Sequence, residues 1–409
     1  MNKFLKEFKD RGFFYQCTSE NELSELLDSK KIKGYIGFDC TAESLHVGSL
    51  LQIMCLRLFQ KHGHRPIVLL GGGTTRIGDP SGKDKTRTIL SEKEIEKNIK
   101  NIEKILKKFL NNSDPKTKPI FVNNYSWLKS LNYISFLRDI GKHFTINKML
   151  SFDSVKTRLE REQSLSYMEF NYMILQAYDF LELNKKEKCS LQIGGSDQWG
   201  NIVNGVELIK RHSNNQTFGL TTPLITLASG AKMGKTADGA IWLDKKFLSS
   251  YNYWQFWRNT DDRDVIKFLK YFTDLKIKEI EDIENKDINE LKILLANKTT
   301  AMLHGEKEAQ SSEKAAKEAF SENSSGSNLP SIKINKKILN DKVNIIEFVI
   351  LSKLETSKSE IRRLIKGNAI KINNNIINDE KFSVDENLFK ENYLKLSIGK
   401  KRHLKITLI

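Results

Sequence analysis

A histidine and a glycine stand two residues apart where a short strand is predicted to give way to a helix. The stretch 35–49 reads YIGFDCTAESLHVGS; apolar alternation ends at Asp39 and an apolar helical run begins at Leu50. The first turn of a helix attracts anions, because its N–H groups are unpaired and the helix dipole is positive there. His46, beside Gly48, could therefore donate a hydrogen bond to a phosphate. A capping or surface histidine is the simpler alternative.

Two lysines three residues apart form a second candidate site for phosphate. Lys232, Lys235 and Thr236 lie in the glycine-rich stretch SGAKMGKTADG (229–239). Ammonium and hydroxyl groups at this spacing suit a clamp on a polyphosphate. The loop GGGTTRIGDPSGK (71–83) also follows a predicted strand, but Gly78 is followed by Asp79. A Walker loop would have a Lys-Ser or Lys-Thr pair after this glycine, so we reject that motif.

Polar side chains interrupt an otherwise apolar helix predicted over 166–183. Tyr172 and Gln176 are four residues apart, and Gln176 and Asp179 three apart, so one helix face presents a phenol, an amide and a carboxylate. A solvent-facing stripe is the alternative, but the apolar neighbours leave little room for it. Buried polar groups need partners. We therefore predict that this face lines a pocket for a small polar amino acid.

The elements that would position these residues alternate between strands and helices. Strands are predicted at 31–38, 66–70 and 189–195, and helices at 47–62, 91–110, 166–183 and 199–212. This alternation is typical of an α/β fold with a doubly wound, Rossmann-like parallel sheet.

Composition and hydrophobic periodicity predict how the chain divides into domains. We expect a Rossmann-like catalytic domain over 1–222, with a helical insertion near 115–160, and then the lysine loop and a helical domain over 223–320. The stretch SENSSGSNLPS (321–331) opens a linker placed at 321–339. A small α+β domain is expected over 340–409, with two helices at 343–354 and 357–367 followed by two hairpins.

Composition excludes several classes of protein. The 409 residues are 39% hydrophobic and 29% charged, without a run of 18 apolar residues, which argues against a membrane span. The N-terminus lacks the pattern of a signal peptide, so we expect a cytosolic protein. Cysteines at 17, 40, 55 and 189 show no metal-ligand spacing, and we predict plain thiols and no metal site.

The net charge of +16 suggests a polyanionic partner. Residues 331–409 hold 17 Lys and Arg against 9 Asp and Glu, which is half of the excess. Like charges four residues apart on a helix repel one another, but an RNA backbone along that face would explain them. The candidate RNA-binding residues are Lys358, Arg362, Arg363, Lys366 and Lys371. The alternative is a general lysine bias, as an AT-rich bacterial genome would produce.

The two phosphate motifs, in this order and about 190 residues apart, resemble the HIGH and KMSKS elements of class I aminoacyl-tRNA synthetases. Three further segments narrow the resemblance: GDPSGK (78–83), YMILQAYDF (172–180) and LQIGGSDQWGN (191–201). They look like those of bacterial-type tyrosyl-tRNA synthetases. The resemblance covers essentially the whole chain, including a tail similar to a small-subunit ribosomal protein. Ile36, Ser49 and Gln52 depart from the family's pattern.

The resemblance implies a role for each candidate residue. Tyrosine would be held by Tyr35, Asp79, Tyr172, Gln176, Asp179 and Gln198. ATP would be bound by Gly37, Asp39, His46, Gly48, Asp197 and Lys235. The reacting phosphates and departing pyrophosphate would meet Thr41, His46, Gly48, Lys83, Arg87, Lys232, Lys235 and Thr236. Mg²⁺ would accompany ATP as substrate, and the resemblance also implies a homodimer with tRNA as partner.

The implied reaction joins tyrosine to ATP and then to tRNA. The tyrosine carboxylate is already ionised at neutral pH, so its attack on the α-phosphate needs no general base. Catalysis would then consist of positioning and electrostatic stabilisation. Two alternatives stay open: a tryptophanyl-tRNA synthetase, and a non-catalytic RNA-binding protein that retains the scaffold. Tyrosine-dependent exchange between ATP and pyrophosphate separates the three.

Overall fold

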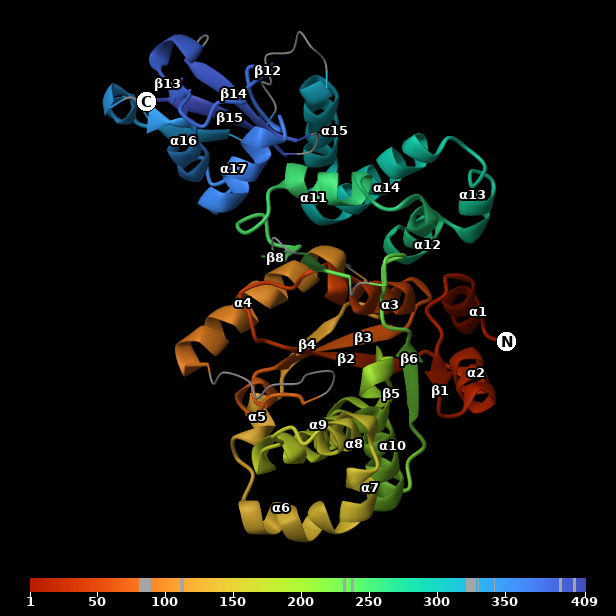
Figure 1. Cartoon of the computed structure of the whole chain (residues 1–409). Helices are drawn as coiled ribbons and strands as arrows, with labels where there is room; N and C mark the ends of the chain where they lie inside the picture. Colours follow the sequence, from red (N-terminus) through yellow and green to blue (C-terminus); the bar gives the residue numbers. More distant parts are fainter. Residues whose placement is uncertain are drawn as a thin grey trace. The chain divides into compact units, whose positions relative to one another are not determined.

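The computed structural model describes residues 1–80, 90–110, 114–230, 233–236, 239–320, 329, 331–341, 343–389, 392–399 and 402–409. The chain forms two compact units (Figure 1). The first joins Met1–Asp244 with Asp261–Ile288, and the second joins Lys245–Thr260 with Asn289–Ile409.

A six-stranded sheet forms the centre of the first unit. Its strand order is β1-β6-β5-β2-β3-β4, and every neighbouring pair is parallel except β1 with β6. The predicted parallel sheet is therefore confirmed, with β1 as an antiparallel edge. The strands are β1 (Gln16–Cys17), β2 (Lys33–Asp39), β3 (Arg65–Gly71), β4 (Ile120–Asn123), β5 (Cys189–Gly195) and β6 (Phe218–Thr222).

Helices cover both faces of this sheet, as a doubly wound fold requires. Figure 1 shows α3 (Leu50–Lys61) and α4 (Glu92–Phe109) on one face, with α9 (Tyr167–Glu187) and α10 (Trp199–Ser213) on the other. Helix α9 begins with a capping box between Ser166 and Glu169. It ends at Lys188, whose left-handed backbone stops the helix. The first unit also contains α1 (Lys3–Asp10) and α2 (Glu20–Ser29), at the N-terminus of the chain.

The predicted helical insertion near 115–160 is partly wrong, because it begins with β4. The apolar sequence PIFVN extends the sheet beside β3, and helices follow only after it. These helices are α5 (Tyr125–Leu128), α6 (Tyr133–Asp139), α7 (Ile146–Leu150) and α8 (Asp153–Glu160). A buried ion pair between Arg158 and Glu169, 3.1 Å apart, ties α8 to the start of α9.

The predicted boundary at residue 222 also differs from the structure. Helices α12 (Asp262–Phe272) and α13 (Ile277–Glu281) belong to the first unit. The buried guanidinium of Arg11 donates to the carbonyls of Lys270, Thr273 and Leu275 at 2.7, 3.1 and 2.8 Å. The carbonyl of Lys270 lies in the last turn of α12, which a helix leaves unpaired, and the other two carbonyls follow the end of the helix.

The second unit contains a helical part and a small sheet. The helices α11 (Ser250–Arg258), α14 (Ile288–His304) and α15 (Glu306–Phe320) are linked through Asn297, which accepts from Trp254 Nε1 at 2.7 Å and donates to Glu313 at 2.6 Å. The sheet has the order β12-β11-β14-β15-β9. Its strands are β9 (Ser331–Ile334), β11 (Ile370–Ile372), β12 (Asn375–Ile376), β14 (Tyr393–Ile398) and β15 (Arg402–Leu408).

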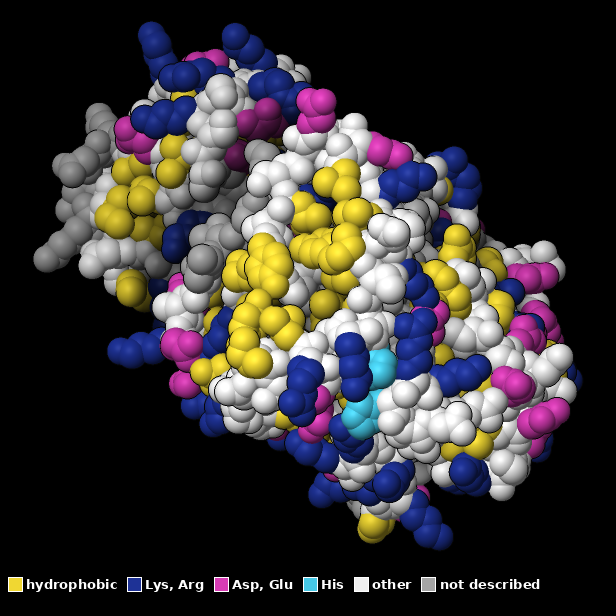
Figure 2. Space-filling model, turned by 90° about the horizontal axis from the view of Figure 1, so that it is seen from below, with side chains coloured by type: hydrophobic (Ala, Val, Ile, Leu, Met, Phe, Trp, Pro, Cys, Tyr) yellow, Lys and Arg dark blue, Asp and Glu magenta, His cyan; other side chains and the backbone are white. Residues whose placement is uncertain are grey.

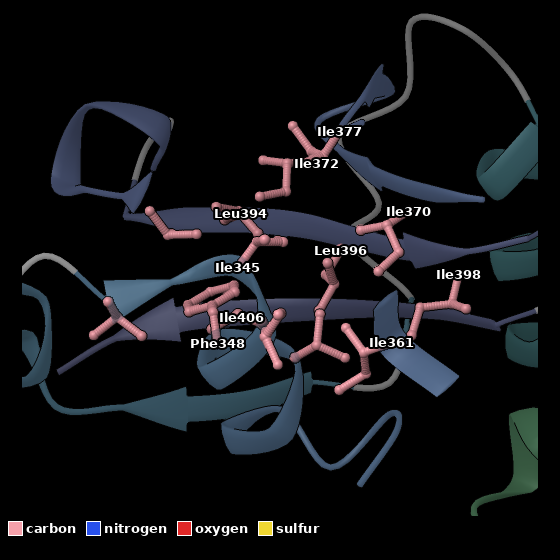
Figure 3. Close-up of a cluster of buried hydrophobic side chains, with 14 of the residues drawn as sticks. Ile345, Phe348, Ile361, Ile370, Ile372, Ile377, Leu394, Leu396, Ile398 and Ile406 are labelled. Atoms are coloured by element: carbon pink, nitrogen blue, oxygen red, sulfur yellow. The ribbon is translucent and has the colours of Figure 1, made fainter. Parts of the chain in front are cut away.

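One face of this sheet packs on α16 (Ile345–Leu351) and α17 (Lys358–Lys366). Figure 3 shows the resulting core, in which Phe348 and Ile361 meet Leu394 and Leu396 of β14. The predicted α+β tail is confirmed, but its linker is shorter than expected. Residues 331–334 form β9, which pairs in parallel with β15, so they belong to the sheet. A second pair joins β10 (Val343–Asn344) to β13 (Ser383–Val384).

Across the described ranges, none of the helices combines the length and apolar character that a membrane crossing requires.

Candidate active site

A cavity of about 320 Å³ opens at the carboxyl ends of β2, β3 and β5. This is the edge at which ligands bind in open parallel sheets. Ten residues that the sequence singled out line it: Tyr35, Gly37, Asp39, Gly48, Asp79, Tyr172, Gln176, Asp179, Asp197 and Gln198. The structure therefore brings together all the residues predicted to bind tyrosine and most of those predicted to bind ATP.

An almost fully buried carboxylate lines the cavity. Asp179 is 2% exposed; its Oδ2 accepts from Asn124 Nδ2 at 2.9 Å and its Oδ1 from Trp127 Nε1 at 2.7 Å. Burial raises the pKa of Asp179 from 3.8 to about 7, although the hydrogen bonds from Asn124 and Trp127 oppose this shift. The two donors fix the direction of the carboxylate toward the cavity.

The hydroxyl of Tyr35 is the second deep polar group. The side chain is 1% exposed and its ring packs on Phe180 with 5.2 Å between centroids. Its Oη hydrogen-bonds to no group in the described part of the chain. Burial, followed by the nearby charge of Asp179, raises the pKa of Tyr35 well above its ordinary value, so the hydroxyl keeps its proton. A ligand hydroxyl could accept from Tyr35 and donate to Asp179.

A chain of hydrogen bonds connects this end of the cavity with the end of β2. Asn124 Nδ2 also donates to Thr74 Oγ1 at 3.0 Å, and Thr74 donates to Asp39 Oδ1 at 2.8 Å. Tyr172 donates to Asp39 Oδ2 at 3.1 Å. The backbone N–H of residue 73 donates to Asn124 Oδ1 at 2.7 Å, so both ends of this amide are used. The network holds two carboxylates in fixed orientations.

Sequence reasoning missed three members of this network: Asn124, Trp127 and Thr74. Asn124 follows directly after β4, and Thr74 follows β3 within the glycine-rich loop. Polar residues directly after parallel strands were the available signal. The signal was lost because residues 120–123 were assigned to a helical insertion instead of a strand.

Three amides and a carboxylate form a second polar wall. Gln198 Nε2 donates to Asp79 Oδ2 at 2.8 Å. Asn201 Nδ2, which sequence reasoning also missed, donates to Gln176 Oε1 at 3.1 Å and to Gln198 Oε1 at 3.2 Å. Asp79 is half-buried, and a carboxylate in this setting attracts a cation such as an ammonium group.

The histidine turn reaches the cavity through Gly48, which lines it. His46 is the N-cap of the short helix η1 (Val47–Ser49), and its Nδ1 accepts from the Gly48 N–H at 3.0 Å. The capping interpretation of His46 is therefore confirmed, and its role as a phosphate donor stays a prediction. Gln52, one of the departures from the family pattern, also lines the cavity and donates to Thr222 Oγ1 at 2.7 Å.

The remaining predicted phosphate contacts are described only in part. Thr41 is exposed in the loop after β2. The backbone of Lys235 and Thr236 forms β7 (Lys235–Thr236), paired with β8 (Gly239–Ala240). Lys83, Arg87 and Lys232 lie outside the described residues.

The basic residues of the tail lie on the surface of α17. Lys358, Arg362, Arg363 and Lys366 are exposed, and Lys371 of β11 is half-exposed. Arg363 pairs with Glu360 at 2.6 Å and Arg362 with Glu380 at 3.4 Å. Two of the five predicted RNA contacts therefore already have carboxylate partners, which was not expected from the spacing.

Replacing the buried carboxylate should change how stability depends on pH. Because the pKa of Asp179 is raised from 3.8 to about 7 in the fold, its ionised form is disfavoured there. The free energy of unfolding should therefore fall as pH rises between these values, and be level above pH 7. Asp179→Asn should remove this contribution. Denaturant unfolding from pH 4 to 8 should show the wild type losing up to about 4 kcal/mol relative to the variant. A difference that is constant over this range would contradict the assignment.

Two protein-family models together match nearly the whole chain. The model of "tRNA synthetases class I (W and Y)" matches residues 27–321. The model of the "Tyrosine--tRNA ligase SYY-like C-terminal domain" matches residues 321–406.

Individual proteins agree with this result. The tyrosine–tRNA ligase of Pelagibacter ubique (strain HTCC1062) is 79% identical over 409 residues, which is 100% of both chains. That of Wolbachia sp. subsp. Brugia malayi (strain TRS) is 53% identical over 410 residues, 99% of this chain and 98% of the relative. A C-terminally truncated mitochondrial tyrosyl-tRNA synthetase of Aspergillus nidulans has a TM-score of 0.71 and 32% identity, covering 78% of this chain and 94% of that one. The chain belongs to the class I tRNA synthetases, in the group of the tyrosine–tRNA ligases.

Proposed function

We propose that the chain activates L-tyrosine with ATP, releasing pyrophosphate, and then transfers the tyrosyl group to the 3′ end of tRNA in the cytoplasm. The observation that carries this proposal is a pair of buried groups in the cavity: the Tyr35 hydroxyl, which has no hydrogen-bond partner among the described residues, and the oriented carboxylate of Asp179. A phenol can donate to the carboxylate and accept from the hydroxyl. Indole has a donor but no oxygen acceptor, so tryptophan would leave Tyr35 unmatched.

The second polar wall suits the amino-acid end of the substrate. Asp79, Tyr172 and Gln176 would hold the ammonium group, because they combine a carboxylate with two oxygen acceptors. The amide of Gln198, oriented by Asp79 and Asn201, would lie near the substrate carboxylate. Both ends of tyrosine would then be fixed relative to β2.

The rim of the cavity would take ATP as its Mg²⁺ complex. Gly37 and Gly48 line the cavity, so adenine would lie close to the backbone at these two residues, and Asp197 would accept from the ribose hydroxyls. Asp39 and Thr41 would lie beside the reacting phosphates.

The chemical step is an in-line displacement at phosphorus. A carboxylate oxygen of tyrosine forms a bond to the α-phosphorus while the bond to the bridging oxygen of pyrophosphate breaks. The charge that develops on the leaving group would be met by His46 Nε2–H and by the cations Lys83, Arg87, Lys232 and Lys235, with the hydroxyl of Thr236. Proton transfer is not required, because the nucleophile is already ionised.

The partner in the second step would be tRNA, bound along the basic face of α17. Lys358 and Lys366 have no carboxylate partner among the described residues, so they are available to phosphates. Arg362, Arg363 and Lys371 would add to this face, the two arginines at the cost of separating them from Glu380 and Glu360.

A homodimer would cover an apolar surface of the first unit. Figure 2 views the molecule from below Figure 1, from the side on which helices α6 to α9 lie, and shows hydrophobic side chains gathered there. A groove of about 450 Å³ lies there, lined mainly by apolar and aromatic side chains from residues 125–137 and 167–175. Tyr133, Leu137 and Tyr167 are 58%, 38% and 67% exposed. Large exposed apolar patches of this kind are typical of interfaces, and a second copy would bury the same patch on both chains.

Amino-acid-dependent exchange between ATP and labelled pyrophosphate tests the proposed first step. Of the twenty amino acids, tyrosine alone should support rapid exchange, because it alone matches both Tyr35 and Asp179. Rapid exchange with tryptophan in place of tyrosine, or no exchange with either, would refute the proposal.

Tyr35→Phe should weaken tyrosine activation without weakening the fold. The hydroxyl has no described partner in the free protein, so its removal leaves no protein group newly unpaired. With tyrosine bound, one hydrogen bond is lost, which should lower kcat/KM about 5- to 30-fold. Phenylalanine activation should not fall, and thermal unfolding should stay at or above the wild-type temperature. A large loss of stability, or equal losses for both amino acids, would contradict the assigned role.

Double substitution of Lys358 and Lys366 by alanine should weaken tRNA binding and its dependence on salt. Each phosphate contact contributes about 0.7–0.9 to the slope of log K against log salt, so the slope should fall by about 1.5. Pyrophosphate exchange should be unchanged. Lys3→Ala, at an exposed lysine of α1, is the control and should leave the slope as it is. An unchanged slope in the double variant would show that RNA binds elsewhere.

Leu137→Asp should dissociate the proposed homodimer. A carboxylate buried without a partner in an apolar interface is strongly disfavoured, so the dissociation constant should rise at least about 100-fold. Sedimentation of the variant should give a monomer where the wild type is a dimer. Tyr15→Asp, at another exposed aromatic residue, is the control and should remain dimeric. A monomeric wild type would refute the proposed dimer, and a dimeric Leu137→Asp would place its interface elsewhere.

A further inference from the structure

The segment after the lysine loop is tied to the histidine turn by backbone pairing. Val47 N–H donates to Ile241 C=O at 2.9 Å, and Leu243 N–H donates to Leu45 C=O at 2.9 Å. Between these bonds His46 and Trp242 form an antiparallel bridge, with ring centroids 6.3 Å apart.

The loop itself continues this contact. Ile241 N–H donates to Gly234 C=O at 3.2 Å, and Met233 N–H donates to Ile225 C=O at 3.2 Å. Residues 233–234 are thus held between the segment at 241 and the start of the loop, on top of the histidine turn.

Gly234 makes the closest approach between the two phosphate motifs. A Cβ at this position would lie 2.8 Å from the Gly48 nitrogen and 2.8 Å from His46 Nδ1. A Cβ at Gly48 would lie 3.0 Å from the carbonyl oxygen of Met233. Real Cβ atoms essentially never approach other atoms within 3.0 Å, and here the neighbouring atoms include backbone, which cannot rotate away. The backbones of the two motifs therefore touch because both positions lack a side chain.

We propose that Gly234 is a positioning residue for adenylate formation, an inference that rests on the proposed function. Its missing side chain lets the lysine loop lie directly on the His46–Gly48 turn. A methyl group at 234 would push the loop away from the turn. It would also press on His46 Nδ1, the atom that accepts from Gly48 N–H, and so turn the imidazole away from the cavity rim.

The expected effect follows from how this reaction is catalysed. The step relies on positioning groups around a charged transition state, and a displacement of about 1 Å can lower such a rate about 100-fold. Tyrosine itself binds at the other end of the cavity, against Tyr35 and Asp179, so its affinity should not depend on Gly234.

Two other glycines in the same segment provide matched controls. Gly230 and Gly239 have φ of +81° and +110°, and Gly234 has φ of +92°. Alanine is disfavoured in all three left-handed conformations by a similar amount, about 1 kcal/mol. A Cβ at Gly230 or Gly239, however, would meet no described atom within 4 Å. Backbone strain is thus common to the three substitutions, and contact with the histidine turn is specific to Gly234.

The test compares Gly234→Ala with Gly230→Ala and Gly239→Ala in the full chain. Single-turnover adenylate formation should fall about 100-fold in Gly234→Ala. Its tyrosine Kd should stay within twofold of wild type. Its unfolding temperature should fall by a few degrees, as in the two control variants, because all three substitutions carry a backbone cost of about 1 kcal/mol. Gly230→Ala and Gly239→Ala should stay within about threefold of the wild-type rate. Equal rates in the three variants, or a loss that appears in the tyrosine Kd, would overturn the inference.

A double variant tests the connection to the histidine. On a His46→Ala background, Gly234→Ala should add less than about tenfold, because part of its effect acts through the imidazole. Losses that multiply in full would overturn this part of the inference. The activity of the wild type distinguishes failure of the proposed function from failure of the positioning role. If the wild type shows no tyrosine-dependent exchange, the proposed function fails. If it is active and Gly234→Ala matches its controls, only the positioning role fails.

Discussion

The arrangement of the whole cavity depends on one buried carboxylate and the groups that hold it. Asp179 is almost fully buried, and its ionised form is disfavoured there, as its raised pKa indicates. Asn124 and Trp127 offset part of this penalty and fix the direction of both oxygens. Through Asn124 and Thr74 the same network reaches Asp39, at the end of the adjacent strand. Asp179 holds an unfavourable charge, and the Tyr35 hydroxyl has no hydrogen-bond partner in the part of the chain that the structure describes. A ligand that matches both groups would recover this free energy.

At the other end of the cavity, the arrangement depends on the close approach of two backbone segments, the histidine turn and the lysine loop. The start of a helix has unpaired N–H groups that can bind phosphate, and in this turn the N–H of Gly48 donates to His46 Nδ1. The lysine loop then lies on this turn, because neither Gly48 nor Gly234 has a side chain that would separate the two backbones. A hydrogen-bond network thus holds the polar groups proposed to recognise the amino acid, whereas the close contact between the two predicted phosphate motifs depends on the absence of side chains.

Local sequence patterns predicted the long helices and most strands of the first unit, but not the short strand β4 or the polar residues Asn124 and Thr74 that follow strands. Helix α9 and its polar face, with Tyr172, Gln176 and Asp179, were predicted from spacing, because helical periodicity is a local property. Asn124 and Trp127 were missed, since they meet Asp179 only through contacts 55 and 52 residues apart in the chain. The same limit explains β9, which was assigned to a linker: its partner β15 lies at the other end of the tail, and a single four-residue strand has no periodicity of its own.

The central claim, that Tyr35 and Asp179 together recognise a phenol, is tested most directly by a crystal structure with tyrosine bound. The phenolic oxygen should lie within about 3 Å of both Tyr35 Oη and an Asp179 carboxylate oxygen, while Asn124 and Trp127 keep their bonds to that carboxylate. A phenolic oxygen placed elsewhere in the cavity, or an Asp179 turned away from Asn124 and Trp127, would contradict the claim.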